Sequence, residues 1–148
     1  MMAAPALDTS HASGGGLVIG FDLVKDPAVL ERAYDDTAGV TAEFNLNILR
    51  RLNRELGANF DLRHFRHQAL WVPEASRIEM RLVSNESQIV TIAGERITFA
   101  ENEPIITEHC HKYTVRGFEA LAARAGWIAQ RVWTDPEHRF SLHYFARH

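Results

Sequence analysis

The chain has 148 residues, of which 46% are hydrophobic and 24% charged, and its formal net charge is −3 at pH 7. This length suits a single domain with a real core, and the slight negative charge gives no reason to expect a nucleic acid or an anionic membrane as a partner. The apolar runs are far shorter than the roughly 20 residues that a membrane-spanning helix needs, and the single cysteine excludes an internal disulfide and fits a cytoplasmic location.

The N-terminal part of the chain predicts a tail, a strand and a helix. Residues 1–16 are rich in Ala, Ser and Gly without periodicity, which predicts a disordered tail with no secretory signal. Residues 17–23 form an almost continuous apolar run, typical of a strand buried on both faces of a parallel sheet. Asp26 and Pro27 then predict the start of a helix that runs to about Asp35.

A second, longer helix is predicted from Thr41 to a stop at Gly57. Its apolar residues recur at i, i+4 spacing and predict a stripe that faces the core, formed by Val40, Phe44, Ile48, Leu52 and Leu56. Asn45 lies outside this stripe. Its side chain either is solvated or contacts a ligand.

From Phe60 onward the hydrophobic period changes to two. Short strands are predicted at 65–72, 77–83, 88–92, 96–99 and 103–110, and together they indicate an antiparallel meander. A helix capped by Thr114 and a hairpin of strands 128–134 and 140–146 follow. This order predicts an α/β fold in which an antiparallel insertion separates two pieces of a sheet.

The stretch EPIITEHCHKY, residues 103–113, carries the most closely spaced polar groups of different chemistry. If the strand continues through Cys110, then Glu108 and Cys110 point to one face and His109 points to the other. One face would then present a carboxylate and a thiol to a pocket. The alternative is that Glu108 pairs with an arginine and Cys110 is a small core residue.

Two other residues have a structural and a functional interpretation. Met80 is a core residue unless its face of the strand opens on a cavity. Tyr34, near the end of the first helix, is either a core residue or a ligand contact.

Metal binding is not expected, although His109, Cys110 and His111 are all ligand types. Adjacent strand residues point to opposite faces, and no second cluster has zinc spacing. No catalytic nucleophile is expected either, because nothing marks a residue that would orient a Cys/His pair. The other histidines after residue 60 are expected at the surface: His64, His67, His138, His143 and His148.

Four stretches together resemble one family, the S-adenosylmethionine-dependent, histidine-specific Nα-methyltransferases of ergothioneine biosynthesis. They are GFDLVKDPAVLERAYDDTAGVTAEFNLNILRRLNRELGANFDL, RIEMRLVS, ITEHCHKY and VWTDPEHRFSLHYF. The resemblance implies the C-terminal part of a class I methyltransferase sheet, made of residues 17–36 and 114–148. It also implies that residues 37–113 form an inserted antiparallel substrate-binding domain.

The resemblance further implies a histidine site. Tyr34 matches a tyrosine that binds the substrate carboxylate, and Met80 matches a methionine beneath the imidazole. Glu108 matches a glutamate that accepts a hydrogen bond from the imidazole. Cys110 stands where the family typically has a serine that contacts the same ring, so a weaker ring contact is expected here, by about 1 kcal/mol.

The family's upstream half, with its Gly-rich cofactor loop, has no counterpart in this sequence. We therefore expect that the chain alone does not bind S-adenosylmethionine, binds histidine weakly and transfers no methyl group. A separate chain would supply the N-terminal half. The hairpin 128–146 is expected to pair with strand 17–23 and to leave that strand's other edge open. The alternative is a non-catalytic amino-acid-binding module or a truncated remnant.

Overall fold

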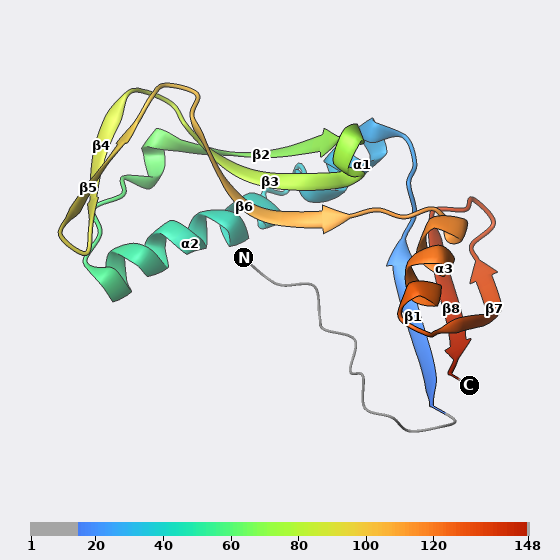
Figure 1. Ribbon diagram of the computed structural model, residues 1–148. Helices are drawn as coiled ribbons and strands as arrows, with labels where there is room; N and C mark the ends of the chain where they lie inside the picture. The colour runs from blue at the N-terminus through green and yellow to red at the C-terminus, as the bar shows by residue number, and fades with distance from the viewer. Residues whose placement is uncertain (1–14, 148) are drawn as a thin grey trace. The chain divides into compact units, whose positions relative to one another are not determined.

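The computed structural model describes residues 15–147, so nearly all of the tail predicted over residues 1–16 lies outside the described residues. The described chain is a mixed α/β structure with three α-helices and antiparallel strand pairs (Figure 1). It divides into two compact units. The first contains the residues up to Asp26 and from His111 onward, and the second is Pro27–Cys110. We call them the terminal unit and the central unit.

A three-stranded antiparallel sheet forms the terminal unit. Its strands are β1 (Gly16–Asp22), β7 (Ile128–Thr134) and β8 (Phe140–Ala146), in the order β1-β8-β7. The predicted hairpin and its pairing with the first strand are confirmed, and β1 lies at an edge of this sheet. The prediction of a parallel strand buried on both faces is wrong, because β1 pairs antiparallel with β8 and alternates between exposed and half-buried residues.

One face of this sheet is apolar and exposed. Cross-strand register places Val18 opposite Tyr144, Gly20 opposite Leu142, and Trp133 opposite Leu142. A Cβ atom on Gly20 would lie 2.7 Å from the ring of Phe140, so the glycine makes room for that ring. We call this surface the open face; its large exposed side chains are Val18, Ile128, Trp133, Phe140, Leu142 and Tyr144.

Helix α3 (Val115–Arg124) covers the opposite face of the sheet (Figure 1). As predicted, Thr114 caps it: the Thr114 hydroxyl accepts a hydrogen bond from the Gly117 backbone N–H at 3.0 Å. The Phe118 ring packs 4.1 Å from the Phe21 ring, measured between centroids. The buried core of the terminal unit therefore lies between α3 and one face of the sheet.

His143 lies within that core, and the prediction that it is a surface residue is wrong. Its side chain is fully buried and stacks between Phe21 and Phe145, at centroid distances of 4.7 Å and 5.4 Å. Its Nε2 atom lies 3.1 Å from the Ser141 hydroxyl. Burial lowers the pKa of His143 below 6.5, and the charge of Glu119 opposes this only in part.

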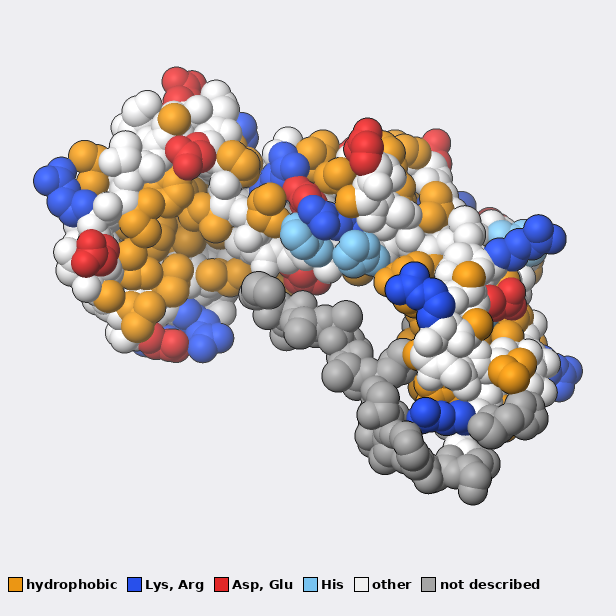
Figure 2. All heavy atoms as spheres, viewed as in Figure 1, with side chains coloured by type: hydrophobic (Ala, Val, Ile, Leu, Met, Phe, Trp, Pro, Cys, Tyr) orange, Lys and Arg blue, Asp and Glu red, His pale blue; other side chains and the backbone are white. Residues whose placement is uncertain are grey.

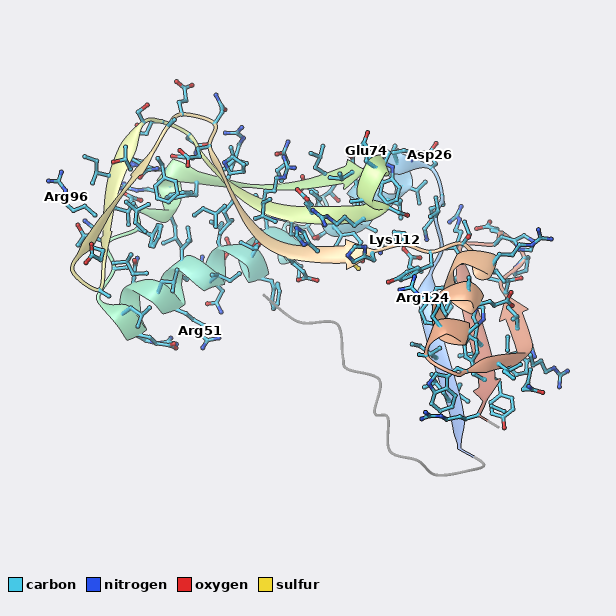
Figure 3. The ribbon with its side chains drawn as sticks, in the orientation of Figure 1. Asp26, Arg51, Glu74, Arg96, Lys112 and Arg124 are labelled. Atoms are coloured by element: carbon cyan, nitrogen blue, oxygen red, sulfur yellow. The ribbon has the colours of Figure 1, made fainter. Side chains whose placement is uncertain are left out.

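The chain leaves the terminal unit after β1 and re-enters it after β6, and these two segments run side by side. Leu23 and Tyr113 form a parallel bridge, and the Val24 N–H donates to the Tyr113 carbonyl at 3.0 Å. Lys112, labelled just beyond β6 in Figure 3, is buried and lies 3.2 Å from an Asp22 carboxylate oxygen. This ion pair fixes the position of the segment that follows β6 within the terminal unit.

The central unit combines two helices, α1 (Pro27–Tyr34) and α2 (Val40–Leu56), with two sheets. Its three-stranded sheet has the order β2-β3-β6, and β4 and β5 form a separate hairpin. The strands predicted from the period of two are therefore confirmed, but a continuous meander is wrong, because β6 joins β3 instead of β5. The strands are β2 (Phe65–Val72), β3 (Arg77–Ser84), β4 (Gln88–Ile92), β5 (Glu95–Phe99) and β6 (Pro104–His111).

Both helices pack on the same face of the three-stranded sheet. Leu30 of α1 packs with Ile78 of β3, and Leu49 of α2 packs with Leu82 of β3. Ile78 and Leu82 are four residues apart on one strand, so they share a face. Met80 lies between them on this face and is 3% exposed.

Of the apolar stripe predicted for α2, Leu52 packs against the core, but the other four residues are exposed. Val40 and Phe44 are 69% and 66% exposed, whereas Asn45 and Leu49 are fully buried. The physical reason is that each i, i+4 step rotates by about 40° around the helix, so five such positions spread over about 160° and cannot share one contact line. Figure 2 shows hydrophobic side chains gathered at the end of the central unit that carries α2, β4 and β5.

None of the helices in the described part of the chain is long and apolar enough to cross a membrane.

The burial of His143 predicts a pH-dependent stability. Its folded-state pKa lies below 6.5, so the unfolded chain takes up the proton first. The contribution of neutral His143 is therefore complete above about pH 6.5 and is lost as the pH falls toward the folded-state pKa. We expect the urea midpoint of unfolding to decrease when the pH is lowered from 7.5 to 5. In His143→Phe, the midpoint should decrease less over the same interval. His111→Phe, at an exposed position, is the control and should retain the full dependence.

Candidate functional site

The four residues singled out from the sequence all belong to the central unit. Tyr34 is the last residue of α1, and Cys110 is near the end of β6. The Tyr34 hydroxyl lies 2.9 Å from Cys110 Sγ, and both side chains are half-buried. Since α1 covers the face of the sheet that carries Met80, this contact places Cys110 on the same face.

Glu108 occupies the neighbouring position on that face of β6. Its side chain is exposed, and among residues 15–147 no arginine forms an ion pair with it, so the predicted alternative of an arginine partner is wrong. The Thr107 hydroxyl donates to the Met80 carbonyl at 2.9 Å, which sets the stretch around Glu108 beside Met80. Tyr34 and Cys110 are thus in direct contact, Met80 is buried in the neighbouring strand, and Glu108 extends toward solvent.

The opposite face of β3 carries a different charge cluster. Glu79 is buried and accepts hydrogen bonds from Arg77 and Arg81, each with a shortest N···O distance of 2.6 Å. These bonds, from Arg81 and then Arg77, lower the pKa of Glu79 despite its burial. His109 Nε2 lies 3.5 Å from Glu79, so His109 and Cys110 point to opposite faces, as predicted. Among the described residues, no group of three or more His, Cys, Asp and Glu side chains is placed to hold a metal.

A polar network under the helices was missed in the sequence. His67 of β2 places Nε2 2.8 Å from the Tyr34 carbonyl oxygen and Nδ1 3.0 Å from Asn45 Nδ2. Asn45 Nδ2 also donates to the Arg81 carbonyl at 3.2 Å. The interpretation of His67 as a surface residue and of Asn45 as solvated is therefore wrong. A signal was present: His67 falls between Phe65 and Ala69 on the inward positions of the strand.

Helix α1 is held against the edge of the sheet at a second point. The Glu31 carboxylate accepts a hydrogen bond from the Trp71 backbone N–H at 2.9 Å. Trp71 belongs to β2, whose only sheet neighbour in the described chain is β3, so this N–H belongs to an unpaired strand edge. The two anchors, at Glu31 and at the Tyr34 carbonyl, lie one helical turn apart and together fix the C-terminal end of α1.

Comparison with known proteins identifies the family. The model of a family described as "Histidine-specific methyltransferase, SAM-dependent" matches residues 3–147. The chain belongs to this family. It is 44% identical, over 136 residues, to a histidine N-alpha-methyltransferase of Mycolicibacterium smegmatis. It is also 29% identical to ergothioneine biosynthesis protein 1 of Neurospora crassa and 25% identical to an L-tryptophan methyltransferase, trpM, of Psilocybe serbica.

These matches cover most of this chain but less than half of each relative. The match with the mycobacterial enzyme takes in 90% of this chain and 42% of that enzyme. The corresponding shares are 93% and 39% for the tryptophan methyltransferase, and 88% and 15% for the Neurospora protein. More than half of each relative therefore lies outside the region that matches this chain.

The starts of α2 and α3 lack the free backbone N–H groups that a binding site for S-adenosylmethionine uses. In class I folds, such a site needs a Gly-rich turn between a strand and a helix with free backbone N–H groups. The N–H groups of Val40 and Thr41, at the start of α2, donate to the Asp36 carboxylate. The bonds from Thr41 are the main reason that the pKa of Asp36 is lowered to about 2. Thr114 caps α3 in the same way, so neither helix start is available to a ligand.

The contact between Tyr34 and Cys110 predicts that the thiol is protected. We expect Tyr34→Phe to raise the rate of Cys110 alkylation by iodoacetamide about fivefold, because a neutral hydrogen bond contributes about 1 kcal/mol. The rate is measured on the native chain and normalised to the rate in urea, where the protection is absent. Tyr144→Phe, at an exposed tyrosine, should leave the rate unchanged. An unchanged rate in Tyr34→Phe would show that the hydroxyl does not protect the sulfur.

Proposed function

We propose that the chain is the substrate-binding part of an S-adenosylmethionine-dependent Nα-methyltransferase that acts on L-histidine, and that it is inactive without the cofactor-binding half. The observation that carries this proposal is the contact between Tyr34 and Cys110 over the sheet face that also carries Met80, with Glu108 two residues before Cys110 on β6. Family membership supports the reaction class. In this proposal the terminal unit contributes to a class I methyltransferase sheet and the product leads toward hercynine and ergothioneine.

Each of the four residues has a role suited to its chemistry. The Tyr34 hydroxyl donates a hydrogen bond to the substrate carboxylate. The Glu108 carboxylate accepts one from an imidazole N–H, and the Met80 thioether packs beneath the ring. Cys110 contacts the ring more weakly than a serine would. Together these contacts hold the unprotonated α-amine in a fixed direction, which is the main requirement for transfer of an already activated methyl group.

Substrate binding requires an exchange of partners at Tyr34. In the structure its hydroxyl lies against Cys110 Sγ. A ligand carboxylate replaces a weak sulfur partner with a charged oxygen, and hydrogen bonds to charged groups are stronger. The half-buried position of both side chains means that this exchange does not require a core residue to be uncovered.

A second candidate function is a non-catalytic module that binds another amino acid. Two observations favour testing it: Cys110 replaces the family's serine at the ring contact, and one relative is a tryptophan methyltransferase. A thiol is less polar than a serine hydroxyl. It therefore packs more favourably against an aromatic ring that lacks a second hydrogen-bonding nitrogen. This function predicts tighter binding of tryptophan or phenylalanine than of histidine.

The proposed partner is a polypeptide equivalent to the upstream part of the relatives, and the open face of the terminal unit is its docking surface. Six large apolar side chains are exposed on that face, while α3 covers the other. Within residues 15–147, β1 also ends the sheet, and no described strand pairs with its outer edge, where a further strand can add. An apolar face next to an unpaired edge is the surface that a continuing sheet with its own helices would cover.

The proposed site predicts weak, residue-dependent binding of L-histidine by the isolated chain. Isothermal titration calorimetry should detect binding, and Glu108→Gln should weaken it roughly tenfold, because the bond to the ring N–H loses its charged acceptor. Glu95→Gln, at an exposed position on β5, is the control and should bind as the unchanged chain does. With S-adenosylmethionine added, no methylated histidine should form. Turnover by the chain alone would contradict the need for a second half, and tighter binding of tryptophan would favour the second candidate function.

The proposed partner predicts complementation. The chain is mixed with the region of the Mycolicibacterium relative that lies upstream of the match, and methylated histidine and co-elution in size-exclusion chromatography are measured. We expect both, and we expect Leu142→Lys to weaken association more than tenfold, since it would bury an unpaired charge. Ile89→Lys, an exposed apolar position of the central unit, is the matched control. Association that is equally sensitive to both substitutions would contradict docking on the open face.

A further inference from the structure

We propose that His67 is a positioning residue: in its neutral, Nε2-protonated form it holds the end of α1 so that the Tyr34 hydroxyl lies against Cys110. The effect of His67 on ligand affinity rests on the proposed function, but its effect on the position of Tyr34 does not. The observation behind the proposal is a continuous chain of hydrogen bonds that runs from α2 through β2 to α1. Its members are Asn45, His67 and the Tyr34 carbonyl.

The partners of His67 determine which ring nitrogen carries the proton. The Tyr34 carbonyl oxygen only accepts hydrogen bonds, so Nε2, which lies 2.8 Å from it, is the protonated nitrogen. Asn45 Nδ2 donates to the Arg81 carbonyl at 3.2 Å, which identifies this atom as the amide nitrogen. The same nitrogen lies 3.0 Å from His67 Nδ1, so Nδ1 must accept and is unprotonated. The network therefore specifies a neutral imidazole in one tautomer.

The position of Asn45 makes this arrangement difficult to change. Asn45 is fully buried, and its Oδ1 atom has no hydrogen-bond partner in the described part of the chain. A proton on His67 Nδ1 would require the Asn45 amide to turn over and present Oδ1. The bond from Nδ2 to the Arg81 carbonyl would then be lost, and Oδ1, an acceptor, would face the carbonyl oxygen, which is also an acceptor. Asn45 thus selects the tautomer, and the tautomer selects the bond to Tyr34.

The bond to Tyr34 acts on the candidate site through the backbone. Tyr34 is the final residue of α1, and its carbonyl accepts the hydrogen bond from His67. Fixing this carbonyl fixes the Cα–Cβ direction of Tyr34, and with it the path of the ring to Cys110. Glu31 anchors the preceding turn of α1 at Trp71. The part of α1 whose position depends on His67 is therefore its last residue.

The first test reads the tautomer in the unchanged chain. Long-range ¹H–¹⁵N correlation spectra of the chain labelled at its histidines distinguish a protonated Nε2 from a protonated Nδ1. The His67 signals are those that disappear in His67→Gln. We expect His67 in the neutral, Nε2-protonated form at pH 7. A cationic ring or an Nδ1-protonated ring would overturn the proposal.

The second test reads the position of Tyr34 through Cys110. His67→Leu removes the donor, and we expect Cys110 alkylation to be about fivefold faster, matching Tyr34→Phe, because the same hydrogen bond to sulfur is lost. His67→Gln can place an amide N–H near the Tyr34 carbonyl and should restore slow alkylation. Gln68→Leu, the adjacent residue whose side chain points to the other face of β2, is the matched control and should alkylate as the unchanged chain does. Circular dichroism verifies that each variant is folded.

The outcomes separate this proposal from the proposed function. Unchanged alkylation in a folded His67→Leu variant would show that His67 does not position Tyr34. If the unchanged chain fails to bind histidine while both tests succeed, the proposed function is contradicted and the positioning role stands. If histidine binds, His67→Leu should weaken its affinity about as much as Tyr34→Phe does, and His67→Gln should recover most of it.

Discussion

The structure of the central unit depends on the burial of both faces of β3. One face carries Ile78, Met80 and Leu82, which the two helices cover, and the other carries Glu79 between Arg77 and Arg81. β3 is also the middle strand of its sheet, so its backbone is paired on both sides. A strand enclosed in this way cannot slip by one residue, because a slip would exchange the apolar and ionic faces. The register of β2 and the positions of α1 and α2 follow from it.

This fixed register explains how the candidate site is assembled from distant parts of the sequence. Tyr34 and Cys110 are 76 positions apart, yet their side chains meet because α1 lies on the helix-covered face and β6 is a sheet neighbour of β3. His67 lies beneath the same helices and connects them by hydrogen bonds. The candidate site therefore stands on a sheet face with little freedom, whereas Tyr34 and Cys110 are half-buried and Glu108 is exposed. That combination suits a site in which precise orientation is the main contribution to the reaction.

The terminal unit has the opposite character. Only one face of its sheet is covered, by α3, and its core includes a buried histidine whose pKa is lowered by burial. The open face and the edge strand expose apolar side chains and unpaired backbone groups at the same place. The matched regions of the relatives account for less than half of their lengths. In the proposed function, these surfaces are where the cofactor-binding half attaches.

The sequence by itself determined the local elements and the family. Periodicity and the Thr114 cap were sufficient for most strand and helix bounds, because these signals act over a few residues. Four conspicuous stretches identified the family, and the alternation of strand residues placed Glu108 and Cys110 together. Only the tertiary structure decided which side of α2 is buried, that β6 joins β3, that His67 bonds to the end of α1, and that His143 is buried. The reason is physical: burial and hydrogen bonding of these residues depend on partners that are distant in the chain, and no local pattern specifies those partners.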